Sequence, residues 1–221
     1  MSDDYDEPPE RRRKANPGRR ERAAARESAA RRADRAAETL DQLLARLGVG
    51  DRDWDWLLFG DGSGSNYRKA SGWATVSVER VTMDRQVWVG AMNRGTVNLA
   101  EMLAYVQPLT WIVNQEQERV KAGGGRRAVR VHIVTDSQYC VTQGEVVGDL
   151  MAKNAGLWAA VAAFRREGIV LHWHHIRRED AALNSFCDGL SKVARRLMEG
   201  YNWSEGPGGA GTTHYDHNPD D

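Results

Sequence analysis

The chain has 221 residues, and its 31 Lys and Arg side chains are balanced by 31 Asp and Glu side chains, which gives a formal net charge of zero at pH 7. That length allows one domain of ordinary size with tails, and a balanced charge neither indicates nor excludes a polyanionic partner. No stretch is long and apolar enough to span a membrane and we recognise no signal peptide, so we expect a cytoplasmic protein that does not enter membranes.

The first 50 residues differ in composition from the rest. Residues 1–18 are acidic and then Arg-rich, with several prolines, which predicts disorder. Residues 19–50 are dense in Ala, Arg and Glu, which predicts a basic helical arm. Its apolar side chains gather near its end, at Leu40, Leu43, Leu44 and Leu47. Two interpretations stay open: a solvated helix whose last turns dock on the domain, or an arm that binds nucleic-acid backbone or a protein partner.

Residues 51–200 have the alternation of apolar and polar segments expected of a folded domain. Three strands are predicted first, over Asp53–Gly60, Gly72–Val81 and Gln86–Met92. Turn residues between them favour an antiparallel meander. A long helix is predicted over Val97–Val120, and we expect Pro108 to kink or divide it.

The second half of the domain alternates between strands and helices. The predicted elements are a strand over Val129–Thr135, helices over Gln138–Val147 and Asn154–Arg166, a strand over Ile169–Ile176 and a helix over Ala181–Glu199. Because a long helix precedes it, the strand at Val129–Thr135 should pair in parallel with the first strand. The predicted fold class is α/β: a mixed five-stranded sheet, three antiparallel strands followed by two parallel ones, flanked by helices. Residues 201–221 are predicted to be a disordered tail.

Four acidic residues have similar places in these elements. Asp61 follows the first predicted strand, Asp136 follows the fourth, and Glu101 and Asp188 lie near the starts of two helices. In open α/β sheets, ligands and chemistry gather at the carboxyl ends of strands. Any one of these acids alone is better explained as a helix cap or a solvated charge, but their recurrence marks a candidate site.

The two cysteines adjoin this set. Cys140 and Cys187 lie close in sequence to Asp136 and Asp188 but far from each other. Two such cysteines favour free thiols and a reducing compartment rather than a disulfide.

The sequences around the four acids resemble those of the ribonuclease H type 1 family. These are DGSGS at Asp61, TVNLAEML around Glu101, TDSQY at Asp136 and NSFCDGLSKVAR around Asp188. The order, the spacing and the helix or strand context match over residues 54–198. The resemblance implies an RNase H-like fold and a metal-dependent endonuclease that hydrolyses the RNA strand of RNA–DNA hybrids, leaving 5′-phosphates.

The resemblance also implies the metal ligands. Two Mg²⁺ ions, or Mn²⁺ in their place, would be held with Asp61 bridging both, Glu101 and Asp136 each completing a site, and Asp188 holding the ion on the water side. Two hard cations can activate a water, offset charge on the phosphoryl oxygens and help the leaving oxygen. Mg²⁺ keeps several waters, so a few carboxylates and the substrate phosphate suffice.

Six further residues would contact the substrate by the same resemblance, namely Gly62, Ser63, Thr96, Asn98, Gln138 and Asn154. The first two would offer backbone groups to the RNA strand, whose 2′-hydroxyl distinguishes it from DNA. Asn98 and Gln138 would contact the minor groove of the hybrid, and Thr96 and Asn154 would hold a phosphate of the DNA strand. Helix capping is the structural alternative, especially for Asn154.

The sequence departs from the family after the last predicted strand, where the family has a loop histidine. Arg178 and Glu179 are the candidates to replace it here. His172, His174 and His175 lie on the strand before the loop, where packing is a more common role for His than proton transfer. The basic protrusion between the two middle helices is also short, so the N-terminal arm is expected to contribute affinity for the hybrid.

Two other functions stay open. One is a different nuclease of the same superfamily, such as a resolvase or an exonuclease, although TDSQY and Asn98 favour a hybrid substrate. The other is a nucleic-acid-binding module without turnover, although such a module has no need of four carboxylates beside a phosphate backbone.

Overall fold

A single mixed sheet forms the centre of the molecule. The structure is a computed structural model and describes residues 38–64, 70–145, 154–178 and 180–204. The strands are β1 (Trp56–Gly64), β2 (Ser71–Glu79), β3 (Arg85–Met92), β4 (Val129–Thr135) and β5 (Ile169–His175). Their order across the sheet is β3-β2-β1-β4-β5, with β1, β2 and β3 antiparallel and with β4 and β5 parallel to β1. The predicted fold class is confirmed.

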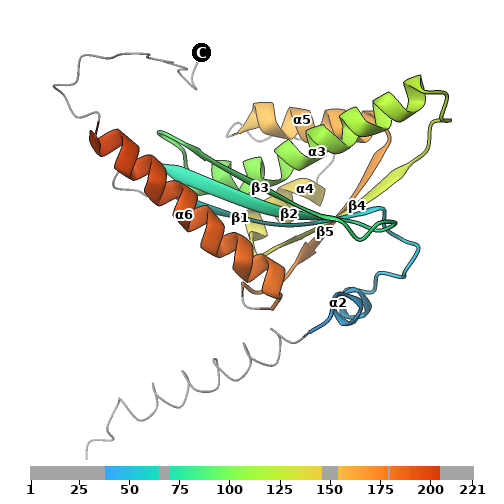
Figure 1. The fold of residues 1–221 in the computed structure, drawn as a ribbon, viewed down its shortest axis with the longest axis horizontal. Helices are drawn as coiled ribbons and strands as arrows, with labels where there is room; N and C mark the ends of the chain where they lie inside the picture. Colours follow the sequence, from blue (N-terminus) through green and yellow to red (C-terminus); the bar gives the residue numbers. More distant parts are fainter. Residues whose placement is uncertain (1–37, 65–69, 146–153, 179, 205–221) are drawn as a thin grey trace, which may run out of the picture.

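Helices cover both faces of this sheet (Figure 1). The described helices are α2 (Leu40–Arg46), α3 (Val97–Lys121), α4 (Gln138–Glu145), α5 (Ala155–Arg166) and α6 (Ala182–Ser204). Side chains of α3, α4 and α5 form one apolar cluster with the sheet, and side chains of α2 and α6 form a second cluster with its other face. None of the helices in the described ranges is both long and apolar enough to cross a membrane.

The central strand β1 is buried on both sides because side chains alternate between the faces of a sheet. Trp56 and Leu58 belong to the α3 side, while Leu57 and Phe59 belong to the α6 side. A strand covered on both faces has a nearly continuous apolar sequence. That burial explains the run of apolar residues before Asp61.

Strand β1 extends further than the sequence predicts. Asp61 was expected to follow the strand, but it lies within β1 and pairs with Ala74 of β2. Gly62 and Gly64 have the composition of a turn, yet their backbone continues the antiparallel ladder to Ser71. Strand β1 therefore carries Asp61, Gly62 and Ser63 on backbone that is paired with β2.

Helix α3 continues through Pro108 as one helix, so the predicted division is wrong. A proline inside a helix removes the hydrogen bond to the carbonyl four residues earlier, which is Ala104. The hydroxyl of Thr75 on β2 donates a hydrogen bond to that same carbonyl oxygen. The sheet thus satisfies the acceptor that Pro108 leaves free.

The ends of the chain differ in part from the prediction. In α2, Thr39 and Gln42 form a capping box, and Leu43 and Leu44 are buried on the α6 side of the sheet together with Val49. Helix α2 therefore docks on the sheet, and the core begins before residue 51. Helix α6 continues to Ser204, which corrects the predicted start of the tail. The rest of the arm, residues 1–37, and the remaining tail, 205–221, lie outside the described residues.

Candidate active site

Three acidic side chains meet where β1, β4 and α3 come together. One oxygen from each of Asp61, Glu101 and Asp136 lies within 4.8 Å of the others. β1 and β4 are adjacent and parallel, which brings Asp61 and Asp136 to neighbouring places on the sheet. Helix α3 reaches them because Gly62 has no side chain: a Cβ there would lie 2.3 Å from the backbone nitrogen of Glu101. Gly62 thus allows Glu101 to join the two aspartates.

Burial raises the free-energy cost of ionising the acids in this cluster. Asp61 is 1% exposed and Glu101 is 5% exposed. Desolvation is the main cause that raises the pKa of Asp61 to about 6, and the charges of Asp136 and Asp188 add to it. Desolvation also raises the pKa of Glu101 well above its usual value, with further contributions from Asp61 and Asp136. Like charges in a buried site favour protonation unless a cation is present.

The cluster also contains oxygen atoms without hydrogen-bond partners. One buried carboxylate oxygen on each predicted acid has none, namely Asp61 Oδ1, Glu101 Oε2, Asp136 Oδ1 and Asp188 Oδ1. Buried polar atoms are nearly always hydrogen-bonded, so four such oxygens in one region require an explanation. Carboxylate oxygens are the ligands that Mg²⁺ prefers. The residues therefore fit the divalent cations that the sequence predicts.

Asp188 lies at the edge of this cluster rather than within the group of three. Its Oδ2 accepts a hydrogen bond from Lys192 Nζ at 2.6 Å. One turn along α6, Ser191 donates a hydrogen bond to Asp61 Oδ2 at 2.6 Å. Helix α6 therefore orients Asp61 and positions Asp188 beside it.

Ser191, Lys192 and Arg195 are site residues that the sequence analysis missed. Arg195 Nε donates a hydrogen bond to Ser63 Oγ at 3.0 Å, which fixes a predicted substrate contact. All three follow Asp188 at intervals of three, four and seven residues, which place side chains on one face of a helix. That spacing is the sequence pattern from which these three residues could have been predicted.

Arg178 faces the acids from the segment after β5. Its Nε lies 2.8 Å from Asp136 Oδ2, its Nη1 3.6 Å from Asp188 Oδ1, and its Nη2 3.9 Å from Asp61 Oδ1. The hydrogen bond to Asp136 raises the pKa of Arg178 above its ordinary value. Of the two candidates to replace the loop histidine, Arg178 reaches the cluster, and Glu179 lies outside the described residues.

The predicted substrate residues differ in whether their side chains already make hydrogen bonds within the protein. Thr96 is the N-cap of α3, and its hydroxyl accepts a hydrogen bond from the backbone of Leu99 at 3.1 Å, as the capping alternative predicts. Asn98, in the first turn of α3, and Gln138, at the start of α4, are exposed. Gln138 Nε2 donates a hydrogen bond to Thr142 Oγ1 at 3.1 Å.

Asn154 is not a side-chain cap, although it precedes α5. Its backbone is left-handed, with φ of 60°, and its side chain makes no capping hydrogen bond. Its Nδ2 donates instead to the hydroxyl of Tyr139 on α4 at 3.1 Å. The structure thus removes the alternative that competed with a ligand-binding role.

His172 and His174 of β5 pack against His132 of β4, as expected for strand histidines, while His175 is exposed. His132 Nδ1 and His174 Nε2 are 2.8 Å apart, and the rings of His132 and His172 stack at 4.5 Å. Desolvation is the main cause that lowers the pKa of His132 to about 4.

Cys140 and Cys187 are buried and free, which confirms the absence of a disulfide between them.

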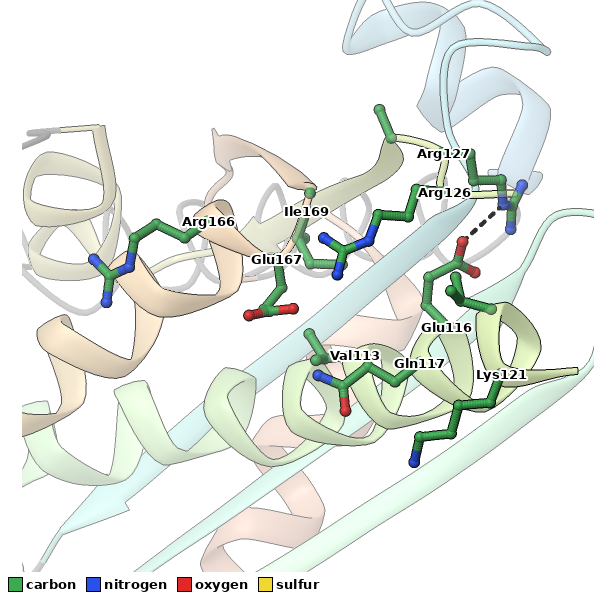
Figure 2. A pocket seen from close by; sticks show the side chains of 12 residues that line it. Val113, Glu116, Gln117, Lys121, Arg126, Arg127, Arg166, Glu167 and Ile169 are labelled. Atoms are coloured by element: carbon green, nitrogen blue, oxygen red, sulfur yellow. Dashed lines mark ion pairs between the residues drawn. The ribbon is translucent and has the colours of Figure 1, made fainter. Parts of the chain in front are cut away.

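A cavity of about 490 Å³ lies at the opposite end of the parallel strands (Figure 2). It is lined by the end of α3, the amino ends of β4 and β5, and the end of α5. Figure 2 shows Glu116 directed at Arg127, with Arg127 Nε 3.4 Å from Glu116 Oε1. Asp136 lies at the carboxyl end of β4, so this cavity is separate from the acidic cluster.

Comparisons with known proteins bear on the fold. No protein-family model matches the sequence, and no curated protein matches it. Among solved structures, LC11-RNase H1, isolated from compost by a metagenomic approach, is similar with a TM-score of 0.51 and 19% identity, over 65% of this chain and 97% of that one. LC11-RNase H1 in complex with RNA/DNA hybrid gives a TM-score of 0.49 at 19% identity, over 65% and 98% of the two chains.

A third solved structure is similar to a comparable extent. It is the N-terminal RNase H domain of rv2228c from Mycobacterium tuberculosis, with a TM-score of 0.47 and 19% identity, over 66% of this chain and 97% of that one. The sheet order, the helices on both faces and the similarity to LC11-RNase H1 lead to one conclusion. The chain has the ribonuclease H-like fold.

Proposed function

We propose that this protein is a metal-dependent endonuclease that hydrolyses the RNA strand of RNA–DNA hybrids. The observation that carries the proposal is the group of Asp61, Glu101 and Asp136 on an RNase H-like sheet, in which one carboxylate oxygen of each acid lies within 4.8 Å of the others. Each of the three acids also has a buried oxygen without a hydrogen-bond partner. A structural role does not explain it, because buried carboxylates that lack partners destabilise a fold.

In this proposal the four acids together would hold the metal ions. Asp61, Glu101 and Asp136 would hold two Mg²⁺ ions, with Mn²⁺ as a substitute, and Asp188 would complete the site on the water side. Bound there, the cations would activate the attacking water and offset charge on the scissile phosphate. Ser191 keeps Asp61 in place through the hydrogen bond at 2.6 Å.

Substrate choice would depend on residues around the cluster. Gly62 and Ser63 adjoin Asp61 on β1, where their backbone could meet the 2′-hydroxyl of an RNA strand. The exposed side chains of Asn98 and Gln138 begin two helices and would contact the minor groove. Thr96 and Asn154 would bind a phosphate of the DNA strand, Thr96 through groups not used in its cap.

The test compares three labelled duplexes, RNA/DNA, RNA/RNA and DNA/DNA, each incubated with the full chain in Mg²⁺, in Mn²⁺ and in EDTA. The proposal predicts cleavage of the hybrid alone, in the RNA strand and only with metal, leaving 5′-phosphates. Equal cleavage of DNA/DNA would reject the hybrid specificity in favour of a resolvase-type nuclease. Binding of hybrid without cleavage in either metal would reject the enzyme.

A further inference from the structure

The guanidinium of Arg178 lies against three acids from three different elements. Its Nε, Nη1 and Nη2 face Asp136, Asp188 and Asp61 respectively, at 2.8, 3.6 and 3.9 Å. We propose that Arg178 is an internal counter-cation that competes with the divalent metal for these carboxylates and must leave before the metal site fills. This inference rests on the proposed metal site.

Arg178 faces oxygens that a metal would need, Asp188 Oδ1 and Asp61 Oδ1, but at distances longer than a hydrogen bond. Only its contact with Asp136 Oδ2 is a hydrogen bond. Oδ1 of Asp61, Asp136 and Asp188 all remain buried without a hydrogen-bond donor. A divalent cation could bind those oxygens directly, and it carries twice the charge of a guanidinium. The same carboxylates therefore attract both cations, and they bind the divalent metal in preference to the Arg178 guanidinium.

Arg178 is also placed so that it can be displaced. Its side chain is 53% exposed, in contrast to 1% for Asp61 and 10% for Asp136. Ion pairs with so exposed a partner are weak, because water competes for the cation. The carbonyl of Arg178 accepts a hydrogen bond from Ser185 Oγ at 3.3 Å, which ties its backbone to α6. A change of side-chain rotamer, without movement of the backbone, is enough to release the guanidinium.

The proposal predicts a specific change in metal affinity. Calorimetric titration with Mn²⁺, without nucleic acid, would compare the wild type with Arg178→Ala, Arg178→Lys and Arg177→Ala. Loss of the competing cation should tighten Mn²⁺ binding about fivefold in Arg178→Ala, since several weak ion pairs are removed. Arg178→Lys should stay close to the wild type because it keeps the charge. Arg177 is the matched control: it is exposed, adjacent and also cationic, and its removal should leave the affinity unchanged.

A second measurement separates this role from a purely structural one. Metal-free Arg178→Ala should have a lower Tm than the metal-free wild type because the acids lose their counter-cation, and saturating Mn²⁺ should remove that difference. Equal or weaker Mn²⁺ binding by Arg178→Ala, or a Tm deficit that persists in Mn²⁺, would overturn the proposal. Neither readout involves cleavage, so the competition can be established even if every duplex is left uncut and the proposed activity fails.

Discussion

Asp61 combines a position inside a β-strand with a buried carboxylate, and this placement opposes folding when no cation is bound. Its pKa is raised to about 6, mainly by desolvation. A raised folded-state pKa means that the folded protein binds a proton more tightly than the unfolded chain. The associated stability is therefore present below about pH 4 and is lost as the pH rises through about 6.

We predict that Asp61→Asn removes this loss. In EDTA, the variant should be more stable than the wild type at pH 7 to 8, by about 1 to 3 kcal/mol, and similar to it near pH 4. Unfolding by urea at several pH values measures the difference. Asp53→Asn is the control, because Asp53 is exposed and outside the cluster. A variant that is less stable than the wild type at pH 8 would contradict the charge argument.

Individual residues also differ in how far the sequence could predict them. The four acids could be identified because each sits in a short local motif such as TDSQY or DGSGS. The bond from Ser191 to Asp61 joins positions 130 residues apart, so no local pattern contains it. The same holds for Arg178, whose residue type is visible in the sequence while its direction depends on how β5 leads into α6.

At the scale of elements, the hydrogen bond between Thr75 of β2 and Ala104 of α3 is the clearest case in which a tertiary contact overrides a local rule, namely that a proline interrupts a helix. Pro108 was expected to kink or divide a helix, and α3 is a single helix of 25 residues. The strands were predicted well where apolar residues alternate, as in β4, and less well at the end of β1. Glycines near Asp61 have the composition of a turn, and only pairing with β2 makes them strand.

We predict that Thr75→Val destabilises the protein by about 1 to 3 kcal/mol, because it leaves the buried carbonyl of Ala104 without a donor. Thr75→Ser should cost less, since it keeps the hydroxyl. In a Pro108→Ala background, the backbone N–H of residue 108 can donate to Ala104, so Thr75→Val should cost clearly less there. Urea unfolding of the wild type, the two single variants and the double variant forms a double-mutant cycle. If Thr75→Val destabilises the wild type and the Pro108→Ala variant equally, the Thr75 hydroxyl and the backbone N–H of residue 108 are not alternative donors to Ala104.

At the scale of the whole molecule, the arm before the domain needs a revised boundary. Removal of everything before residue 50 would delete Leu43 and Leu44, which are buried against the sheet. A chain that begins at Glu38 keeps α2, its Thr39 cap and the ion pair of Glu38 with Arg46. It lacks the eleven basic residues between positions 11 and 35.

We predict that this shortened chain folds normally but binds RNA–DNA hybrid more weakly at low salt. For every phosphate that the arm neutralises in the full chain, its removal should reduce the slope of log affinity against log salt by about 0.9. Turnover at saturating hybrid should hardly change, because the arm contributes none of the four acids. Fluorescence anisotropy over a range of salt concentrations measures the slope. If the full chain and the shortened chain have the same affinity and slope, the arm is a solvated helix or a segment that binds a protein partner.

The most direct measurement for the whole account is cleavage of labelled hybrid in Mg²⁺ by the wild type and by Asp136→Asn. Asp136 contributes one of the three converging oxygens, and the amide keeps the shape of the side chain while it removes the charge that would hold a cation. The account predicts that the variant stays folded by circular dichroism, with a Tm no lower than that of the metal-free wild type, and that its cleavage falls about a thousandfold, in the range of the loss of a principal catalytic group. Undiminished cleavage by a folded Asp136→Asn would contradict the assignment of the acidic cluster as the active site.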